Sequence, residues 1–180
     1  MNKSVYDSPD KVSENNRHIL TVLVDNEPGV LAKVIGMFSG RGYNIESLNV
    51  AEVSNDEHIS RITIVTQGTE EVVSQIEKQL LRIVPVHSVT NLDQEGSSVE
   101  AEVALVYIYV NESNKKNVYQ ICDFYRARKI ENENNSIIFE IAGASERINS
   151  FIKEISQITK IEIVRSGPVA ISTFKKNEEE

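Results

Sequence analysis

The sequence predicts an α+β fold in which two halves of the chain each run β-α-β-β-α-β. Apolar stretches of strand length alternate with stretches whose apolar residues recur at helical spacing. This order occurs twice, and a polar segment at residues 94–98 separates the two occurrences as a linker. Such an order forms an antiparallel sheet with both helices on one face, the ferredoxin-like arrangement. We therefore expect two such domains, at residues 17–93 and 99–174.

In the first half, apolar and β-branched residues predict strands at residues 18–24, 43–53, 59–66 and 83–92. Asn55 and Asp56 supply the turn between the middle two strands, and Pro85 suits a strand start or a sheet edge. One helix is predicted from Val30 to Phe38 and is ended by glycines at 40 and 42. A second helix is predicted from 72 to 80.

The second half repeats the pattern. Strands are predicted at residues 103–110, 129–131, 137–141 and 161–164, and helices at 118–125 and 148–155. Residues 1–16 are mostly polar and predict a mobile tail, and residues 175–180 predict a solvated acidic tail.

Each predicted sheet has one face without helices. Strands that are apolar on both sides need a partner for that face, and a small domain gains stability by associating. We therefore expect two subunits to pair as a homodimer.

Composition excludes several classes of function. The net charge is −8, and nucleic-acid binding depends on Lys and Arg, so we expect no nucleic-acid partner. No apolar run is long enough for a membrane span, and the N-terminus carries no apolar signal core. Cys122 is the only cysteine and is expected to be a buried core thiol. These features favour a soluble, cytoplasmic protein.

The most informative segment joins the first strand to the first helix, and runs from Asp25 to Leu31. The first N–H groups of a helix have no internal acceptor, and with the helix dipole they attract anions. Pro28 fits the first turn, and Gly29 lets a ligand approach the backbone. A structural alternative stays open, in which Asn26 only caps the helix and Gly29 only permits tight packing.

A second segment, Arg41-Gly-Tyr-Asn-Ile-Glu-Ser-Leu48, follows the first helix. Together with residues 18–24, 26–31, 34–39 and 75–80, it resembles the ACT domain, and specifically the regulatory small subunit of acetolactate synthase. In the second half, residues 139–143 and 161–170 resemble the later strands of that family. This half departs from the family pattern in lacking basic residues near Ala101 and Tyr107, and an Arg-Gly pair after the last strand.

The resemblance implies that a branched-chain amino acid, such as valine, leucine or isoleucine, binds between two paired first domains. Backbone N–H groups at the helix start would take its carboxylate, and amide oxygens would take its ammonium. The implied effector site comprises Asn26, Glu27, Pro28, Gly29, Val30 and Leu31 from one chain, with Asn44 and Ile45 from its partner.

The resemblance also implies a non-catalytic chain that regulates a separate large subunit, through feedback inhibition of branched-chain amino acid biosynthesis. Thiamine diphosphate, Mg²⁺ and FAD would belong to that catalytic partner, and no cofactor is expected in this chain. A stand-alone amino-acid sensor without this partner is the alternative.

Two other functions are disfavoured by the residues. An acylphosphatase-like enzyme would need an Arg in the first loop, but Arg17 precedes the predicted strand, and Asp25 and Glu27 would repel a phosphate. The three histidines, at 18, 58 and 87, lack metal-ligand spacing and are expected at surfaces or sheet edges. An RNA-binding domain would need aromatic residues on its central strands, where this sequence has aliphatic ones.

Overall fold

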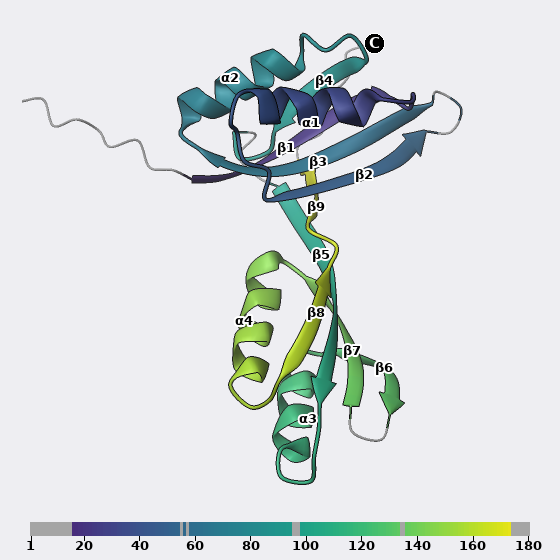
Figure 1. The fold of residues 1–180 in the computed structure, drawn as a ribbon, viewed down its shortest axis with the longest axis vertical. Coiled ribbons are helices and arrows are strands. Elements are labelled where there is room, and N and C mark those ends of the chain that lie inside the picture. The colour runs from purple at the N-terminus through teal and green to yellow at the C-terminus, as the bar shows by residue number, and fades with distance from the viewer. Residues whose placement is uncertain (1–15, 55, 57, 95–97, 134–135, 174–180) are drawn as a thin grey trace, which may run out of the picture.

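A computed structural model describes residues 16–54, 56, 58–94, 98–133 and 136–173. Two α+β domains lie one above the other along the long axis of the molecule (Figure 1). The predicted tails lie outside the described residues, except for Asn16, which begins the first strand.

The first domain contains β1 (Asn16–Asp25), α1 (Val30–Gly40), β2 (Ser47–Ser54), β3 (Ile59–Gly68), α2 (Glu70–Leu80) and β4 (Val86–Asn91). Its antiparallel strands lie in the order β2-β3-β1-β4, and both helices cover one face of this sheet (Figure 1). Strand alternation explains the layering. Leu20, Val22 and Val24 are fully buried and pack with Val34 and Phe38 of α1.

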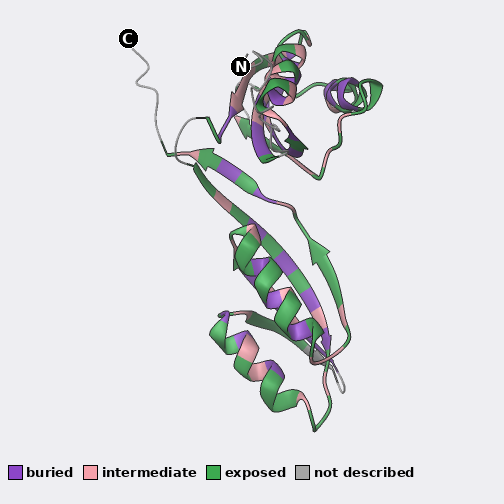
Figure 2. Cartoon of the chain, turned by 90° about the vertical axis from the view of Figure 1, so that its left-hand side faces the viewer, coloured by how far each residue is buried: buried purple, intermediate pink, exposed green. Residues whose placement is uncertain are grey.

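The second domain contains β5 (Ser98–Tyr109), α3 (Lys115–Phe124), β6 (Arg128–Glu133), β7 (Ser136–Gly143), α4 (Ser145–Ser156) and β8 (Ile161–Arg165). Its strand order, β6-β7-β5-β8, repeats that of the first sheet. Buried residues lie on the strands and on the sides of the helices that face them (Figure 2). The predicted fold class, two ferredoxin-like domains, is confirmed.

A further strand, β9 (Val169–Ser172), was not predicted. It pairs with Ser98–Ala101, so that β5 begins five residues before the predicted Val103 and extends beyond its own sheet. This two-stranded ribbon reaches the helix-free face of the first sheet (Figure 1). There Ala170 packs with Ile19, Val65 and Leu92 in a small buried cluster. Part of the open face is thus covered within one chain.

Two predicted strands begin later than expected. β2 begins at Ser47 instead of Tyr43, because Gly42 has a positive φ of 70° and the Tyr43 N–H bonds back to Phe38. β4 begins at Val86 instead of 83, because residues 81–85 form turns after α2. Pro85 accordingly precedes an edge strand, as predicted.

Two basic side chains, Arg17 and His18, lie elsewhere than predicted. Arg17 lies within β1 instead of preceding it. His18 is 7% exposed on a central strand, with its Nε2 3.2 Å from the carbonyl of Gly68, so it is a buried histidine.

Cys122 is fully buried as predicted, and burial raises the pKa of its thiol to about 12. None of the helices in the described part is long and apolar enough to cross a membrane.

Candidate functional site

The loop between β1 and α1 is held by backbone hydrogen bonds from two neighbouring turns. Asp25 N–H donates to the carbonyl of Pro85 at 2.9 Å, and Asn26 N–H donates to the carbonyl of His58 at 2.6 Å. These bonds anchor the end of β1 to the β2–β3 turn and to the start of β4. The loop after them, from Asn26 to Gly29, is exposed.

Gly29 is the N-cap of α1 and adopts a left-handed conformation, with φ 88° and ψ −7°. A Cβ atom at this position would meet no atom within 4 Å. Glycine is therefore needed for its backbone angles, and the alternative of tight packing is wrong. Pro28 precedes the cap instead of lying in the first turn. Asn26 is not the cap, and no side chain of the described residues caps this helix.

Donors at the start of α1 are left without partners. Val30 N–H donates to the carbonyl of Glu27 at 3.3 Å, so it is less free than predicted. Lys33 N–H donates to the carbonyl of Gly29 at 3.1 Å. Within the described residues, no acceptor faces the N–H groups of Gly29, Leu31 or Ala32. The geometry thus offers an exposed cluster of backbone donors at the positive end of a helix dipole. Ala32 is not among the predicted site residues, and its N–H is free because the Gly29 cap has no side-chain acceptor.

Two carboxylates flank these donors, and each has a basic partner. Glu27 Oε1 lies 3.1 Å from Lys33 Nζ, and Asp25 Oδ1 lies 2.6 Å from His87 Nε2. The first turn of α1 itself contains no acidic residue. An anion at the free donors would therefore meet no competing carboxylate from the helix.

Asn44 and Ile45 lie at the opposite end of α1. The Asn44 carbonyl accepts a hydrogen bond from Thr66 Oγ1 at 2.7 Å, and Ile45 packs half-buried against the first core. The 11 residues of α1 span about 16 Å. One protomer therefore does not bring Asn44 to its own loop, although the Asn44 side chain is exposed at the surface.

Within the described residues, no group of three or more His, Cys, Asp or Glu side chains is placed to hold a metal ion. The exposed backbone donors of the loop are suited to an anionic ligand.

Two βαββαβ domains in tandem, the first with an uncapped helix start facing solvent, fit the arrangement of an ACT-type regulatory protein. The first domain matches the family model described as "AHAS small subunit-like ACT domain" over residues 20–88. The second matches "Small subunit of acetolactate synthase" over residues 101–173. The chain belongs to the acetolactate synthase small-subunit family.

The sequence of this chain is similar to those of individual relatives along most of its length. It is 42% identical over 161 residues to the acetolactate synthase isozyme 3 small subunit of Salmonella typhimurium, covering 89% of this chain and 98% of the relative. The Escherichia coli protein of that name is 43% identical over the same coverage. The crystal structure of the acetolactate synthase small subunit from Thermotoga maritima has a TM-score of 0.80 and 34% identity, covering 89% of this chain and 99% of that one. Family membership supports a regulatory role and not a catalytic one.

Proposed function

We propose that this chain regulates an acetolactate synthase by binding a branched-chain amino acid, valine or its analogues leucine and isoleucine, between two paired first domains. The observation that carries the proposal is the set of unpaired backbone donors at the start of α1. The family of the chain supplies the enzyme whose activity is regulated.

The chemistry of the loop fits a small zwitterion. Its carboxylate would accept hydrogen bonds from the N–H groups of Gly29 and Leu31, and from that of Ala32. Its ammonium would be bound by the side-chain oxygens of Asn26 and of Asn44 from the partner subunit. The branched side chain would pack against Val30 and Leu31 of the loop, and against Ile45 across the interface. Pro28 and Glu27 complete the loop that frames the ligand.

A homodimer would bring the two parts of this site together. β2 is an edge strand of the first sheet, and one outward row of α1 consists of the small residues Ala32, Gly36 and Gly40, with exposed Lys33 and Ile35 beside it. Two copies that pair side by side around a two-fold axis would place their α1 helices antiparallel. The start of one helix then lies beside the end of the other, where Asn44 is exposed. Small residues permit this close approach.

Regulation follows from the position of the ligand. A ligand bound across two chains favours one way of packing them, and a catalytic subunit that contacts the dimer senses that change as an altered affinity or activity. The proposed partner is the acetolactate synthase large subunit, which would hold thiamine diphosphate, Mg²⁺ and FAD. This chain would hold none of them, and valine would act as a feedback inhibitor of the partner in the cytoplasm.

Calorimetry of the full-length chain with valine, leucine and isoleucine tests the sensing half of this proposal. We expect saturable heat with one or more of the three, and no heat with all three would contradict it. Co-purification with the large subunit from the same organism, with and without valine, tests the other half. Valine binding without any association with the large subunit would indicate a stand-alone sensor instead.

A further inference from the structure

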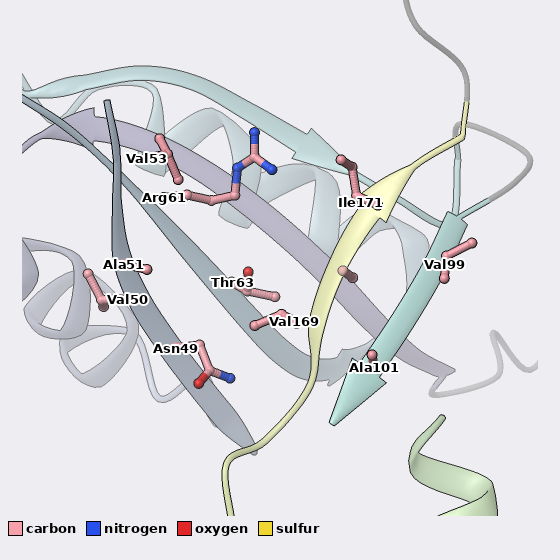
Figure 3. A pocket seen from close by; sticks show the side chains of 11 residues that line it. Asn49, Val50, Ala51, Val53, Arg61, Thr63, Val99, Ala101, Val169 and Ile171 are labelled. Atoms are coloured by element: carbon pink, nitrogen blue, oxygen red, sulfur yellow. The ribbon is translucent and has the colours of Figure 1, made fainter. Parts of the chain in front are cut away.

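A groove lies between the two domains, on the helix-free face of the first sheet. It has a volume of about 410 Å³, within the range of small-molecule sites. One wall is the helix-free face of β2 and β3, and the other is the ribbon formed by β5 and β9 (Figure 3). Its lining is mostly aliphatic, with Val53, Val99, Val169 and Ile171 around the rim.

One charged side chain faces this groove without a partner. Arg61, on β3, lines it together with Ala51, its neighbour across the β2–β3 pairing (Figure 3). The Nε atom of Arg61 is buried and makes no hydrogen bond, and no ion pair to Arg61 is found in the described part of the chain. The cost falls on the Nε–H alone, because its water is removed and no acceptor replaces it, whereas the terminal nitrogens of the guanidinium are not among the buried unpartnered atoms.

An anionic group in the groove would pair with the terminal nitrogens of Arg61, and the aliphatic rim would bury a hydrocarbon tail beside it. The polar side chains of the lining, besides Arg61, are Asn49 and Thr63. Asn49 donates its Nδ2–H to the carbonyl of Pro168 at 3.0 Å and so already has a partner. Among the described residues that line the groove there is no carboxylate, so they offer no counter-charge to a ligand's ammonium.

We infer that this groove binds an aliphatic monocarboxylate that lacks an ammonium group, with its carboxylate on Arg61 and its chain along the valine-lined rim. The ligand differs in charge from the zwitterion proposed for the α1 loop. It also binds to a different part of the molecule, since the groove uses the helix-free face of the first sheet.

Binding there would couple the two domains. The β2–β3 wall belongs to the first domain, whereas Val99 and Ile171 belong to the second. A ligand that contacts both walls favours the arrangement in which they face each other, and so resists their separation. The groove is therefore a place where a metabolite could act on the chain independently of the effector loop.

Hexanoate is a suitable probe, with hexylamine and hexan-1-ol as matched ligands that reverse or remove its charge. Calorimetry of the full-length chain should give saturable binding of hexanoate, and at least about tenfold weaker binding of the other two. The Arg61 Nε–H resonance in a nitrogen-correlated NMR spectrum should shift with hexanoate alone. Equal binding of all three probes, or an unmoved Arg61 resonance, would overturn the inference.

Substitutions supply the second arm of the test. Arg61→Gln should weaken hexanoate binding at least about tenfold, whereas Arg61→Lys keeps the charge and should retain part of it. Arg82→Gln, an exposed position outside the groove, is the control for net charge and should bind as the parent does. Hexanoate affinity unchanged in Arg61→Gln would refute the site. The heat of valine binding is measured on the same variants and should not change. Valine binding tests the α1 loop and hexanoate binding tests the groove, so the failure of one proposal is distinguished from the failure of the other.

Discussion

Arg165 and Glu102 form a two-point ion pair where β8 meets β5. Arg165 Nε lies 2.7 Å from Glu102 Oε1, and Nη2 lies 2.6 Å from Oε2. Glu102 is only 3% exposed, and Ser145 Oγ donates to its Oε2 at 3.0 Å. The Arg165 guanidinium lowers the pKa of the Glu102 carboxyl, against the opposing effect of burial. A buried carboxylate of the second domain is thus stabilised by one arginine.

Removing the arginine should cost more than removing the carboxylate. Arg165→Met leaves a buried charge without its partner and should lower the free energy of unfolding by about 3 kcal/mol. Glu102→Gln leaves an arginine that reaches water, and should cost about 1–2 kcal/mol. Denaturant-dependent hydrogen exchange of the β5 and β7 amides would measure both. The double variant is the control, and equal costs for the two single variants would contradict this account.

The same pair predicts a dependence of stability on pH. Because the folded pKa of Glu102 lies below its ordinary value of 4.5, the unfolded chain binds more protons between those two values. The stabilisation is fully present above the ordinary pKa and is lost as pH falls through the folded one. Glu102→Gln should therefore show a flatter loss of second-domain stability in acid, measured by the same exchange method. A profile as steep as that of the parent would exclude Glu102 as a source of the acid sensitivity.

The fold was predictable because its strands and helices obey simple periodicity. The core residues Val22, Phe38 and Phe151 each fall where strand alternation or helical spacing places them. β9 was not predicted, since its four residues follow a βαββαβ set that was already complete. Its position depends on the contact of Ala170 with Val65, which lies in another domain and leaves no local pattern.

The candidate site was predictable only in part. An uncapped helix start after Gly29 follows from residue types, but the bond that engages the Val30 N–H depends on loop geometry. His18 is buried on a central strand, with its Nε2 3.2 Å from the Gly68 carbonyl of the neighbouring strand, and this placement depends on sheet order. The unpartnered Arg61 could not be predicted at all, because a lone arginine on a strand normally faces solvent.

Gly29→Asp should abolish binding of the branched-chain amino acid. It would place a carboxylate beside the donors that the ligand's own carboxylate needs. The protomer has room for the new side chain, but the positive φ strains any residue other than glycine. Gly29→Asn is the matched control, because it has the same shape, tolerates that φ and carries no charge. Calorimetry should show no heat for Gly29→Asp and weakened but measurable binding for Gly29→Asn. Equal affinities in the two variants would remove the loop from the site.

A mixed dimer tests whether the site spans two chains. Gly29→Asp and Asn44→Ala should each abolish or strongly reduce binding as homodimers. In a heterodimer of the two variants, one site carries both substitutions and the other carries neither. Calorimetry of heterodimers purified with two different tags should therefore recover parental affinity at one ligand per dimer. If loop and Asn44 acted within one chain, every site would carry a substitution and no binding would return.

Gly36→Glu should separate the proposed dimer without unfolding the protomer. Gly36 is exposed at the centre of the outward row of α1, and a Cβ atom there would meet nothing within 4 Å. Glu favours helix by up to about 1 kcal/mol over Gly, so the protomer should not lose stability. A charged side chain would nevertheless lie between two closely packed helices, where it has no water and no partner.

Sedimentation velocity would measure the outcome at concentrations where the parent chain is a dimer. Gly36→Glu should sediment as a monomer and should lose valine binding with it, because Asn44 of the partner subunit is then absent. Gln120→Glu, an exposed position on α3, adds the same charge elsewhere and should remain a dimer. A dimer that persists in Gly36→Glu with full valine affinity would mean that α1 does not form the subunit interface. The free donors at its start would then have to bind the ligand without help from a second chain.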